Sequence, residues 1–236
     1  MYKAIIFDMD GTLIDSDDVV ISTWDELFKV FKPKDLKYNR EDFRRFSGPA
    51  LKGSLKEVFP EYDLDFIHNE YCTRTKKYYD KCCRLFPDVK ETLNKLKCDG
   101  YKLGVLTTKN KEMTHVCLKR FGIDNLIDIV ISCDDVTHFK PEPEGMEIIK
   151  NRLNLKNNEI LYIGDNDIDY LTSKNSDVDC ILMTMCKRVY KVQVNPICYI
   201  NNYVDLYKEI KKHDNWKRYR NYRCWSCWDE LCVIFM

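Results

Sequence analysis

Two pairs of aspartates in this sequence follow short apolar runs. Asp8 and Asp10 come after the run Ala4–Phe7, and Asp165 and Asp169 follow a second apolar run, in the stretch GDNDID. Carboxylates that lie close together raise each other's pKa unless a cation neutralises them. A hard divalent cation such as Mg²⁺ prefers oxygen ligands and commonly binds a few carboxylates together with a substrate phosphate. Asp8, Asp10 and Asp165 are therefore the expected metal ligands.

Two hydroxyls and one ammonium group complete this set of polar side chains. Thr107 and Thr108 lie in the stretch GVLTTKN, and Lys140 lies in HFKPEPEG. Taken alone, Thr107 could cap a helix and Lys140 could be a solvated lysine of a loop. Taken together with the carboxylates, they are groups that would hold the oxygens of a phosphate. The combination indicates phosphoryl transfer.

The run GDNDID also has the alternating aspartates of a calcium-binding loop, and it could equally be an acidic turn. The calcium loop needs Gly at its sixth position and Glu at its twelfth. This chain has Tyr170 and Ser176 at those positions. The sequence therefore excludes the calcium loop and leaves the acidic turn open.

Composition narrows the class of protein. The chain has 236 residues, with 38 Lys plus Arg against 38 Asp plus Glu, so its formal net charge is zero. A neutral chain gives no reason to expect a nucleic-acid partner. No apolar run approaches the roughly 20 residues of a membrane span, and the start lacks the apolar stretch of a signal peptide. We therefore expect a cytoplasmic protein without a membrane partner, either a monomer or a homodimer.

Short β-branched runs alternate with helical patterns along most of the chain, which predicts parallel strands joined by crossover helices. The expected strands are Lys3–Asp8, Lys102–Thr107, Ile129–Ser132, Ile160–Gly164, Cys180–Thr184 and Ile197–Ile200. The expected helices are 111–121, 144–153, 167–174 and 202–212. We therefore predict an α/β fold with a Rossmann-like, doubly wound parallel sheet. Ligands of such sheets bind beyond the carboxyl ends of the strands, where the polar residues above fall.

One connection is too long to be a simple crossover. After the first strand, the segment 16–86 has helical patterns at 16–31, 41–46, 52–59 and 65–82. A structureless loop of that length is implausible in a compact domain. We interpret the segment as an inserted helical cap domain above the strand ends, with a core domain formed by residues 1–15 and 87–212. The acidic run Asp15–Asp18 would mark the hinge, where negative charge favours the N-terminal end of a helix dipole.

Most of the twelve cysteines are single and lie in apolar or helical stretches, which is typical of reduced thiols. The tail 213–236 has one CxxC pair but no second pair to complete a zinc site. Apolar residues recur in this tail at three- and four-residue spacings, at Trp225, Trp228, Cys232 and Phe235. We expect them to form a helical stripe that packs against the core or a second subunit.

Four stretches resemble, in order, the signature motifs of the haloacid dehalogenase superfamily of phosphohydrolases: FDMDGTLIDS, GVLTTKN, KPEPEG and YIGDNDID. The similarity covers residues 4–212. Within this superfamily, the helical insert resembles the cap of the group that contains phosphoglycolate phosphatase and β-phosphoglucomutase. The stretches FSGPALKGSL and DDVTHFKPEPEG are most similar to the branch of phosphoglycolate phosphatases and bacterial pyrophosphatases.

The resemblance implies a role for each motif residue. Asp8 would be the nucleophile that forms an aspartyl-phosphate, and Asp10 would be the general acid and base. Asp165 would bind Mg²⁺ together with Asp8 and the main-chain carbonyl of Asp10. Asp169 would act through a water molecule or by supporting these ligands. The phosphate-binding side chains would be Thr107, Thr108 and Lys140.

The function implied is hydrolysis of a small phosphorylated metabolite by a Mg²⁺-dependent phosphatase similar to phosphoglycolate phosphatase. Dehalogenases of the superfamily generally lack the second aspartate, which is present here as Asp10. Inorganic pyrophosphatase and a β-phosphoglucomutase-like mutase stay open, although the mutases look to have a basic residue where this chain has Leu51. Outside enzymes, the alternative is a module that binds a phosphorylated metabolite without turnover.

Specificity is expected in the cap loop Phe46–Lys52, which would close over the phosphate. The candidate residues are Arg45, Ser47, Gly48 and Lys52. Arg44, Arg45 and Lys52 could bind an anionic part of the substrate, such as a carboxylate or a second phosphate. The alternative for Phe46 and Leu51 is that they pack between helices.

Overall fold

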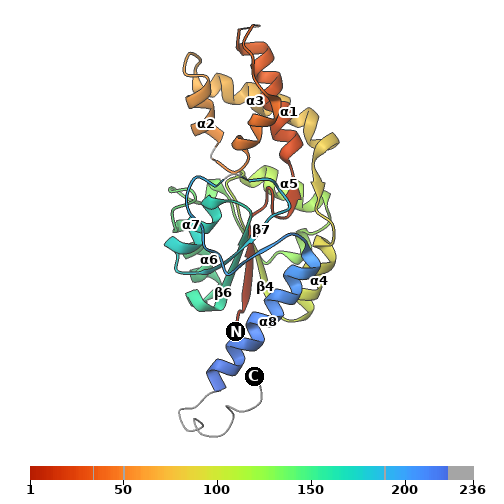
Figure 1. The fold of residues 1–236 in the computed structure, drawn as a ribbon, viewed down its shortest axis with the longest axis vertical. Coiled ribbons are helices and arrows are strands. Elements are labelled where there is room, and N and C mark those ends of the chain that lie inside the picture. The colour runs from red at the N-terminus through yellow and green to blue at the C-terminus, as the bar shows by residue number, and fades with distance from the viewer. Residues whose placement is uncertain (34, 50, 189, 223–236) are drawn as a thin grey trace, which may run out of the picture.

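The chain forms a sheet flanked by helices, with a second group of helices above one end of the strands (Figure 1). The computed structural model describes residues 1–33, 35–49, 51–188 and 190–222. The doubly wound α/β fold predicted from the sequence is confirmed.

Six parallel strands in the described residues form the main sheet, in the order β5-β4-β1-β6-β7-β8. Their bounds are β1 (Ala4–Phe7), β4 (Lys102–Leu106), β5 (Ile129–Ile131), β6 (Ile160–Gly164), β7 (Asp179–Met183) and β8 (Cys198–Ile200). Each strand keeps within one residue of its predicted range. The central strand β1 pairs with β4 on one side and with β6 on the other, so that Phe7 lies between Val105 and Ile163.

Helices cover both faces of this sheet. They are α4 (Val89–Cys98), α5 (Lys111–Arg120), α6 (Glu144–Leu153), α7 (Asp167–Asn175) and α8 (Tyr203–Tyr222). On β1, Ile5 and Phe7 point into a hydrophobic cluster shared with α4, α5 and α8, whereas Ala4 and Ile6 point into a second cluster with α6. This alternation follows from the two-residue period of a strand, and burial on both faces explains why β1 is apolar throughout.

The inserted helices have a hydrophobic cluster of their own. They are α1 (Asp17–Phe31), the 3₁₀ helix η1 (Arg40–Phe46), α2 (Leu51–Val58) and α3 (Leu64–Cys82), and we call residues 17–82 the helical segment. Trp24 lies at the centre of the cluster and stacks on Phe46, with ring centroids 3.8 Å apart. Leu55 of α2 and Ile67 of α3 are fully buried beside it. The segment therefore packs as a unit above the sheet.

A short antiparallel ladder joins the helical segment to the sheet. The strand β2 (Ile14–Asp15) pairs with β3 (Arg84–Leu85), so that the chain enters and leaves the helical segment at adjacent positions. The sequence did not predict this ladder, because strands of two residues leave no readable periodicity.

At the C-terminal end, α8 begins one residue after its predicted start and continues to Tyr222, well beyond its predicted end. The apolar stripe expected in the tail, from Trp225 to Phe235, lies outside the described residues. Within the described part of the chain, none of the helices has both the length and the apolar character that crossing a bilayer requires.

Candidate active site

The predicted site lies at the carboxyl ends of β1, β4 and β6, where the order of strands along the chain reverses. Asp8 directly follows β1, and its backbone N–H donates to the carbonyl of Ile163 at 2.8 Å. Its side chain is only 5% exposed, whereas that of Asp10 is 23% exposed. The nucleophile candidate is thus fixed and buried, and the acid–base candidate is nearer to solvent.

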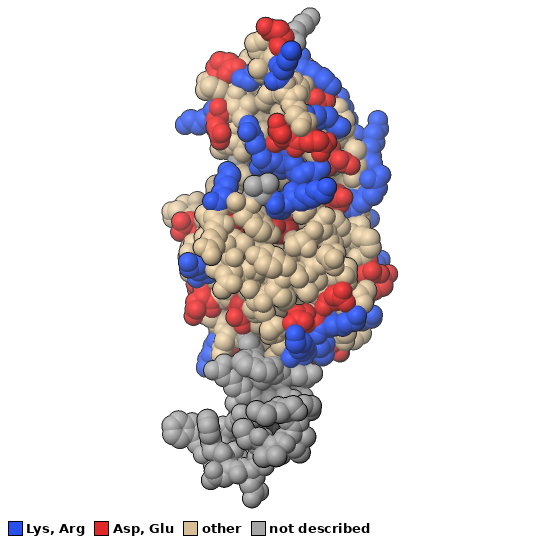
Figure 2. Space-filling view, in the orientation of Figure 1, with Lys and Arg blue, Asp and Glu red and all other residues tan. Residues whose placement is uncertain are grey.

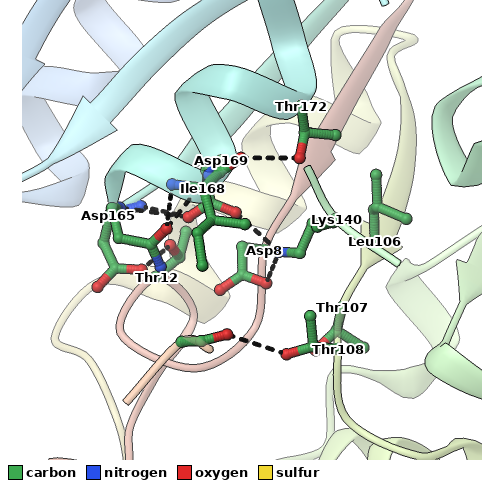
Figure 3. Close-up of polar contacts among 12 residues, drawn as sticks. Asp8, Thr12, Leu106, Thr107, Thr108, Lys140, Asp165, Ile168, Asp169 and Thr172 are labelled. Atoms are coloured by element: carbon green, nitrogen blue, oxygen red, sulfur yellow. Dashed lines mark hydrogen bonds and ion pairs between the residues drawn. The ribbon is translucent and has the colours of Figure 1, made fainter. Parts of the chain in front are cut away.

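Lys140 connects two of the carboxylates. Its Nζ lies 2.6 Å from Oδ1 of Asp8 and 2.7 Å from Oδ1 of Asp169 (Figure 3). It also donates to the hydroxyl of Tyr162 at 3.1 Å. Burial disfavours the charged form of Lys140, but Asp169 and Asp8 outweigh it and raise the pKa of Lys140. The residue is therefore a permanent cation beside Asp8. Among the described residues, no side chain donates a hydrogen bond to the other oxygen of Asp8.

Asp169 acts as a support for its neighbours. Its Oδ2 accepts from the backbone N–H groups of Asp165 and Asn166, at 3.1 and 3.2 Å. In return, the side chain of Asn166 accepts from the N–H of Asp169, which forms a capping box at the start of α7. This exchange fixes the turn that carries Asp165 from the end of β6 toward Asp8.

Three buried carboxylates could hold a metal ion. Oxygens of Asp8, Asp165 and Asp169 lie within 4.8 Å of one another. Burial raises the pKa of Asp8 to about 7 and also raises that of Asp165, although Lys140 and Arg188 respectively oppose the rise. The cluster is therefore short of positive charge, and a divalent cation with oxygen ligands would supply it. Because Asp169 already binds Lys140 and two backbone amides, Asp8 and Asp165 are the better direct ligands.

The side chain of Asp10 points to a different set of partners. It accepts a hydrogen bond from Ser16 at 2.6 Å and forms an ion pair with Lys109, with Nζ and Oδ2 3.0 Å apart. Its carboxylate does not belong to the cluster of Asp8, Asp165 and Asp169. The metal contact predicted for Asp10 uses the main-chain carbonyl and stays a prediction.

The two threonines after β4 face the site from the other side of Asp8 (Figure 3). Thr107 is buried, and its hydroxyl accepts the N–H of Lys109 at 3.1 Å. The hydroxyl of Thr108 donates to the carbonyl of Gly48 in the helical segment at 3.4 Å. Thr107 is therefore placed to bind a phosphate oxygen, whereas Thr108 contacts the loop above it.

A cavity of about 390 Å³ lies between the sheet and the helical segment. Asp8, Asp10, Thr107, Thr108 and Lys140 line its floor. The opposite wall comes from the helical segment and includes Val20, Phe46, Leu51, Tyr71 and Thr75. On the face of the molecule in Figure 2, lysine and arginine side chains gather along the lower part of the helical segment, above the core.

The structure brings only some of the predicted specificity residues to this cavity. Ser47 and Gly48 line it, but Arg45 and Lys52 do not. Arg45 is exposed and lies over the ring of Phe46 at 4.8 Å, and Lys52 is exposed and pairs with Asp65 at 3.6 Å. Phe46 and Leu51 take part in both arrangements that we considered, because they pack in the helical cluster and also line the cavity.

Two cations of the site were missed by the sequence analysis. Lys109 lines the cavity and pairs with Asp10, and it stands two residues after Thr107 in the same motif. Arg188 lies in the connection between β7 and β8, with its Nε 2.5 Å from Oδ2 of Asp165. The position of Lys109 directly after a strand end was a usable signal. No signal in the sequence marked Arg188, since no motif surrounds it.

These features place a buried aspartate, paired with a lysine, at the end of the first strand and beside two further carboxylates. The family model of the haloacid dehalogenase-like hydrolases matches residues 5–183, which include every predicted catalytic, phosphate-binding and metal-binding residue. The chain therefore belongs to this family, and the resemblance inferred from its motifs is confirmed.

Curated relatives and solved structures agree with this assignment. A pyrophosphatase PpaX from Halalkalibacterium halodurans is 36% identical over 176 residues, which make up 75% of this chain and 80% of the relative. A haloacid dehalogenase-like hydrolase structure from Bacteroides fragilis superposes with a TM-score of 0.77 at 26% identity, over 87% of this chain and 100% of the other. A structure from Haemophilus somnus, assigned by prediction as a phosphoglycolate phosphatase, gives a TM-score of 0.69 at 24% identity, over 89% of this chain and 98% of the other. At that identity the likeness shows the fold alone.

Proposed function

We propose that this protein is a Mg²⁺-dependent phosphatase that hydrolyses a small phosphate ester through an aspartyl-phosphate. The observation that carries the proposal is the pairing of buried Asp8 with Lys140. Lys140 holds one oxygen of Asp8 at 2.6 Å, and the other oxygen is left for attack. Asp10 follows two residues later and lines the floor of the same cavity.

In the first half-reaction, the free oxygen of Asp8 attacks phosphorus in line, and the bond from phosphorus to the leaving oxygen breaks. Asp10, which enters this step protonated and out of its ion pair with Lys109, gives its proton to the leaving oxygen, which departs as an alcohol. In the second half-reaction, Asp10 takes a proton from water while that water attacks the phosphorus of the aspartyl-phosphate. The bond between phosphorus and the Asp8 oxygen breaks, phosphate leaves, and the Asp8 carboxylate and protonated Asp10 are restored.

The other residues bind and orient the phosphate. Lys140 and the hydroxyl of Thr107 would stabilise the phosphate oxygens as charge develops on them. Asp8, Asp165 and the main-chain carbonyl of Asp10 would hold Mg²⁺, which supplies positive charge to the phosphate. Buried Lys140 already neutralises one oxygen of Asp8, which favours catalysis over simple phosphate binding. The presence of Asp10 favours catalysis as well, because a module that only binds phosphate does not need an acid–base residue.

The size of the cavity favours a substrate with an organic leaving group. Its volume of about 390 Å³ falls in the range of pockets that bind small organic ligands. Val19, Val20, Leu51 and Met113 give part of the wall an apolar character that pyrophosphate would not use. A small phosphate ester, such as phosphoglycolate or a sugar phosphate, is therefore our first choice.

Pyrophosphate is the second candidate. The relative from Halalkalibacterium halodurans named above is a pyrophosphatase and is 36% identical. In this chain, the ammonium group of Lys109 lies in the cavity wall and could bind the charged leaving phosphate. A mutase activity is less well supported, because no basic residue stands at position 51.

A panel of phosphate compounds tests the proposal. The purified protein is assayed with Mg²⁺ against p-nitrophenyl phosphate, phosphoglycolate, sugar phosphates and pyrophosphate, with and without a bisphosphate activator that a mutase would need. We expect hydrolysis of at least one ester, and we expect Asp8→Asn to abolish it. The matched control is Asp18→Asn, which makes the same change at an exposed residue. A wild-type protein that binds one of these esters but hydrolyses none would refute the enzyme and favour the binding module.

A further inference from the structure

A buried arginine outside the family motifs contacts a predicted metal ligand. Arg188 lies in the connection between β7 and β8, and its side chain is only 6% exposed. Its Nε lies 2.5 Å from Oδ2 of Asp165, and its Nη1 lies 2.8 Å from Oδ1 of Asp17. Gly11, with φ of +88°, makes room for this arrangement, since a Cβ there would overlap both Asp165 and Arg188. The guanidinium group thus joins the metal cluster to the start of α1.

Asp17 is shared between the core and the helical segment. It is the first residue of α1 and is buried. While Oδ1 binds Arg188, Oδ2 binds Nη1 of Arg44 in η1 at 2.5 Å. Burial disfavours the charged form of Asp17, but Arg188 and Arg44 outweigh it and lower its pKa. The contacts therefore run from Asp165 through Arg188 and Asp17 to Arg44, and η1 leads directly into the loop above the cavity.

The bonds of Arg188 are incomplete in this arrangement. Its Nη2 is buried and has no hydrogen-bond acceptor among the described residues. A buried donor without an acceptor costs free energy, so the arrangement does not give this guanidinium group its best possible set of partners. Arg188 also places a full positive charge beside a carboxylate that a divalent cation would use. The arginine and the cation therefore compete for the charge of Asp165.

We propose that Arg188 is a positioning residue that weakens cation binding at Asp165 and, through Asp17 and Arg44, couples that binding to the placement of the helical segment. This inference rests on the metal site of the proposed function. When a cation binds Asp165, the ion pair of Arg188 with Asp165 weakens and its ion pair with Asp17 strengthens. This in turn changes the ion pair between Asp17 and Arg44. By linkage, a change at Arg44 must alter cation binding in turn.

Titration calorimetry with Mg²⁺ tests the proposal without any measurement of activity. We expect Arg188→Gln to tighten Mg²⁺ binding by about fivefold or more, which is the lower end of typical couplings between sites. The control is Lys187→Gln, which removes the same charge from the exposed neighbouring residue and should leave the affinity unchanged. Tightening of less than about fivefold, or weaker binding, would overturn the competition.

A second variant tests the coupling and does not depend on the stability of the first. Arg44→Gln should tighten Mg²⁺ binding in the same direction, because Asp17 is then left to Arg188 alone and draws it from Asp165. The double variant should bind no more tightly than Arg188→Gln, since Arg44 acts through Arg188. Additive effects would overturn the coupling. If Arg188→Gln does not fold, an unchanged or weakened affinity of Arg44→Gln for Mg²⁺ would by itself overturn the coupling.

The same titrations separate this inference from the proposed function. A wild-type protein that binds no Mg²⁺ would refute both the metal-dependent function and the coupling. A wild-type protein that binds Mg²⁺ and hydrolyses esters, with variants at Arg188 and Arg44 that bind as the wild type does, would refute only the coupling.

Discussion

The contact of Gly48 with the core can be tested by one added methyl group. Gly48 has φ of +109°, a conformation that side-chain-bearing residues rarely adopt. Its carbonyl accepts from Thr108, and a Cβ on it would lie 2.8 Å from Nδ2 of Asn166. Asn166 cannot easily retreat, because its Oδ1 accepts from the backbone N–H groups of Ile168 and Asp169. Gly48→Ala should therefore push the loop away from the floor of the cavity.

The size of the effect follows from the backbone strain. An L-residue in a left-handed conformation costs about 1–2 kcal/mol, and the close contact with Asn166 adds to this. If catalysis requires the seated loop, that cost lowers the population of the competent form by about 5- to 30-fold. We expect kcat/KM to fall by this factor, while the sheet and its central strand stay folded.

Steady-state kinetics on the best substrate of the panel measures this loss. The matched control is Gly53→Ala in the exposed part of α2, where an added Cβ meets no atom within 4 Å. Because alanine is the better helix former, this control should keep full activity and gain up to about 1 kcal/mol of stability. A kcat/KM for Gly48→Ala within twofold of the wild type would refute the reasoning that the seated loop is needed for turnover.

Three further predictions concern the proposed acid–base residue, the loop before Lys140 and the proposed metal. Asp10→Asn should lower kcat/KM, which reports only the steps up to the aspartyl-phosphate, by about 10²- to 10⁴-fold on an alkyl phosphate but by much less on p-nitrophenyl phosphate, whose leaving group needs no proton; equal losses in kcat/KM would argue against a general acid. Although burial opposes it, hydrogen bonds from Ser132 and the charge of Lys111 lower the pKa of Asp135 to about 2. The contribution of Asp135 to the free energy of unfolding should be present above pH 4 and lost as the pH falls toward 2. In urea unfolding, Asp135→Asn should therefore cost about 1 kcal/mol at pH 7 and almost nothing near pH 2. A difference between the variant and the wild type that does not depend on pH would contradict this. A chelator should abolish turnover and added Mg²⁺ should restore it, whereas turnover that persists in the chelator would exclude a required metal.

Much of the fold was predictable because its signals are local. A parallel strand buried on both faces reads as an apolar run, and a polar residue at its end reads as a site at the sheet edge. This is why the sequence alone could place Asp8, Thr107 and Asp165 at the edge of the sheet. Lys140 could be assigned to the site only together with the carboxylates and threonines of the other motifs, since a lysine in a proline-rich loop carries no signal of its own.

The contacts that sequence reasoning missed join residues distant in the chain. Asp17 was read as part of an acidic helix start, yet it is a buried ion-pair partner of Arg188, which lies 171 residues away. Arg45 and Lys52 were chosen for their charge, but the turn of η1 and the phase of α2 direct them to the surface. Charge can be read from sequence, whereas the direction of a side chain on a short helix depends on packing.

The ladder of β2 and β3 has a consequence for how this protein can change. The ladder holds the entry and the exit of the helical segment side by side. With respect to the core, the insertion is therefore a closed loop whose two ends stay at a fixed separation. The entropy of closing a loop grows only slowly with its length. The insertion could therefore grow, shrink or be exchanged for another with little effect on the sheet beneath it. Such an architecture allows the reaction and the choice of substrate to evolve at separate rates.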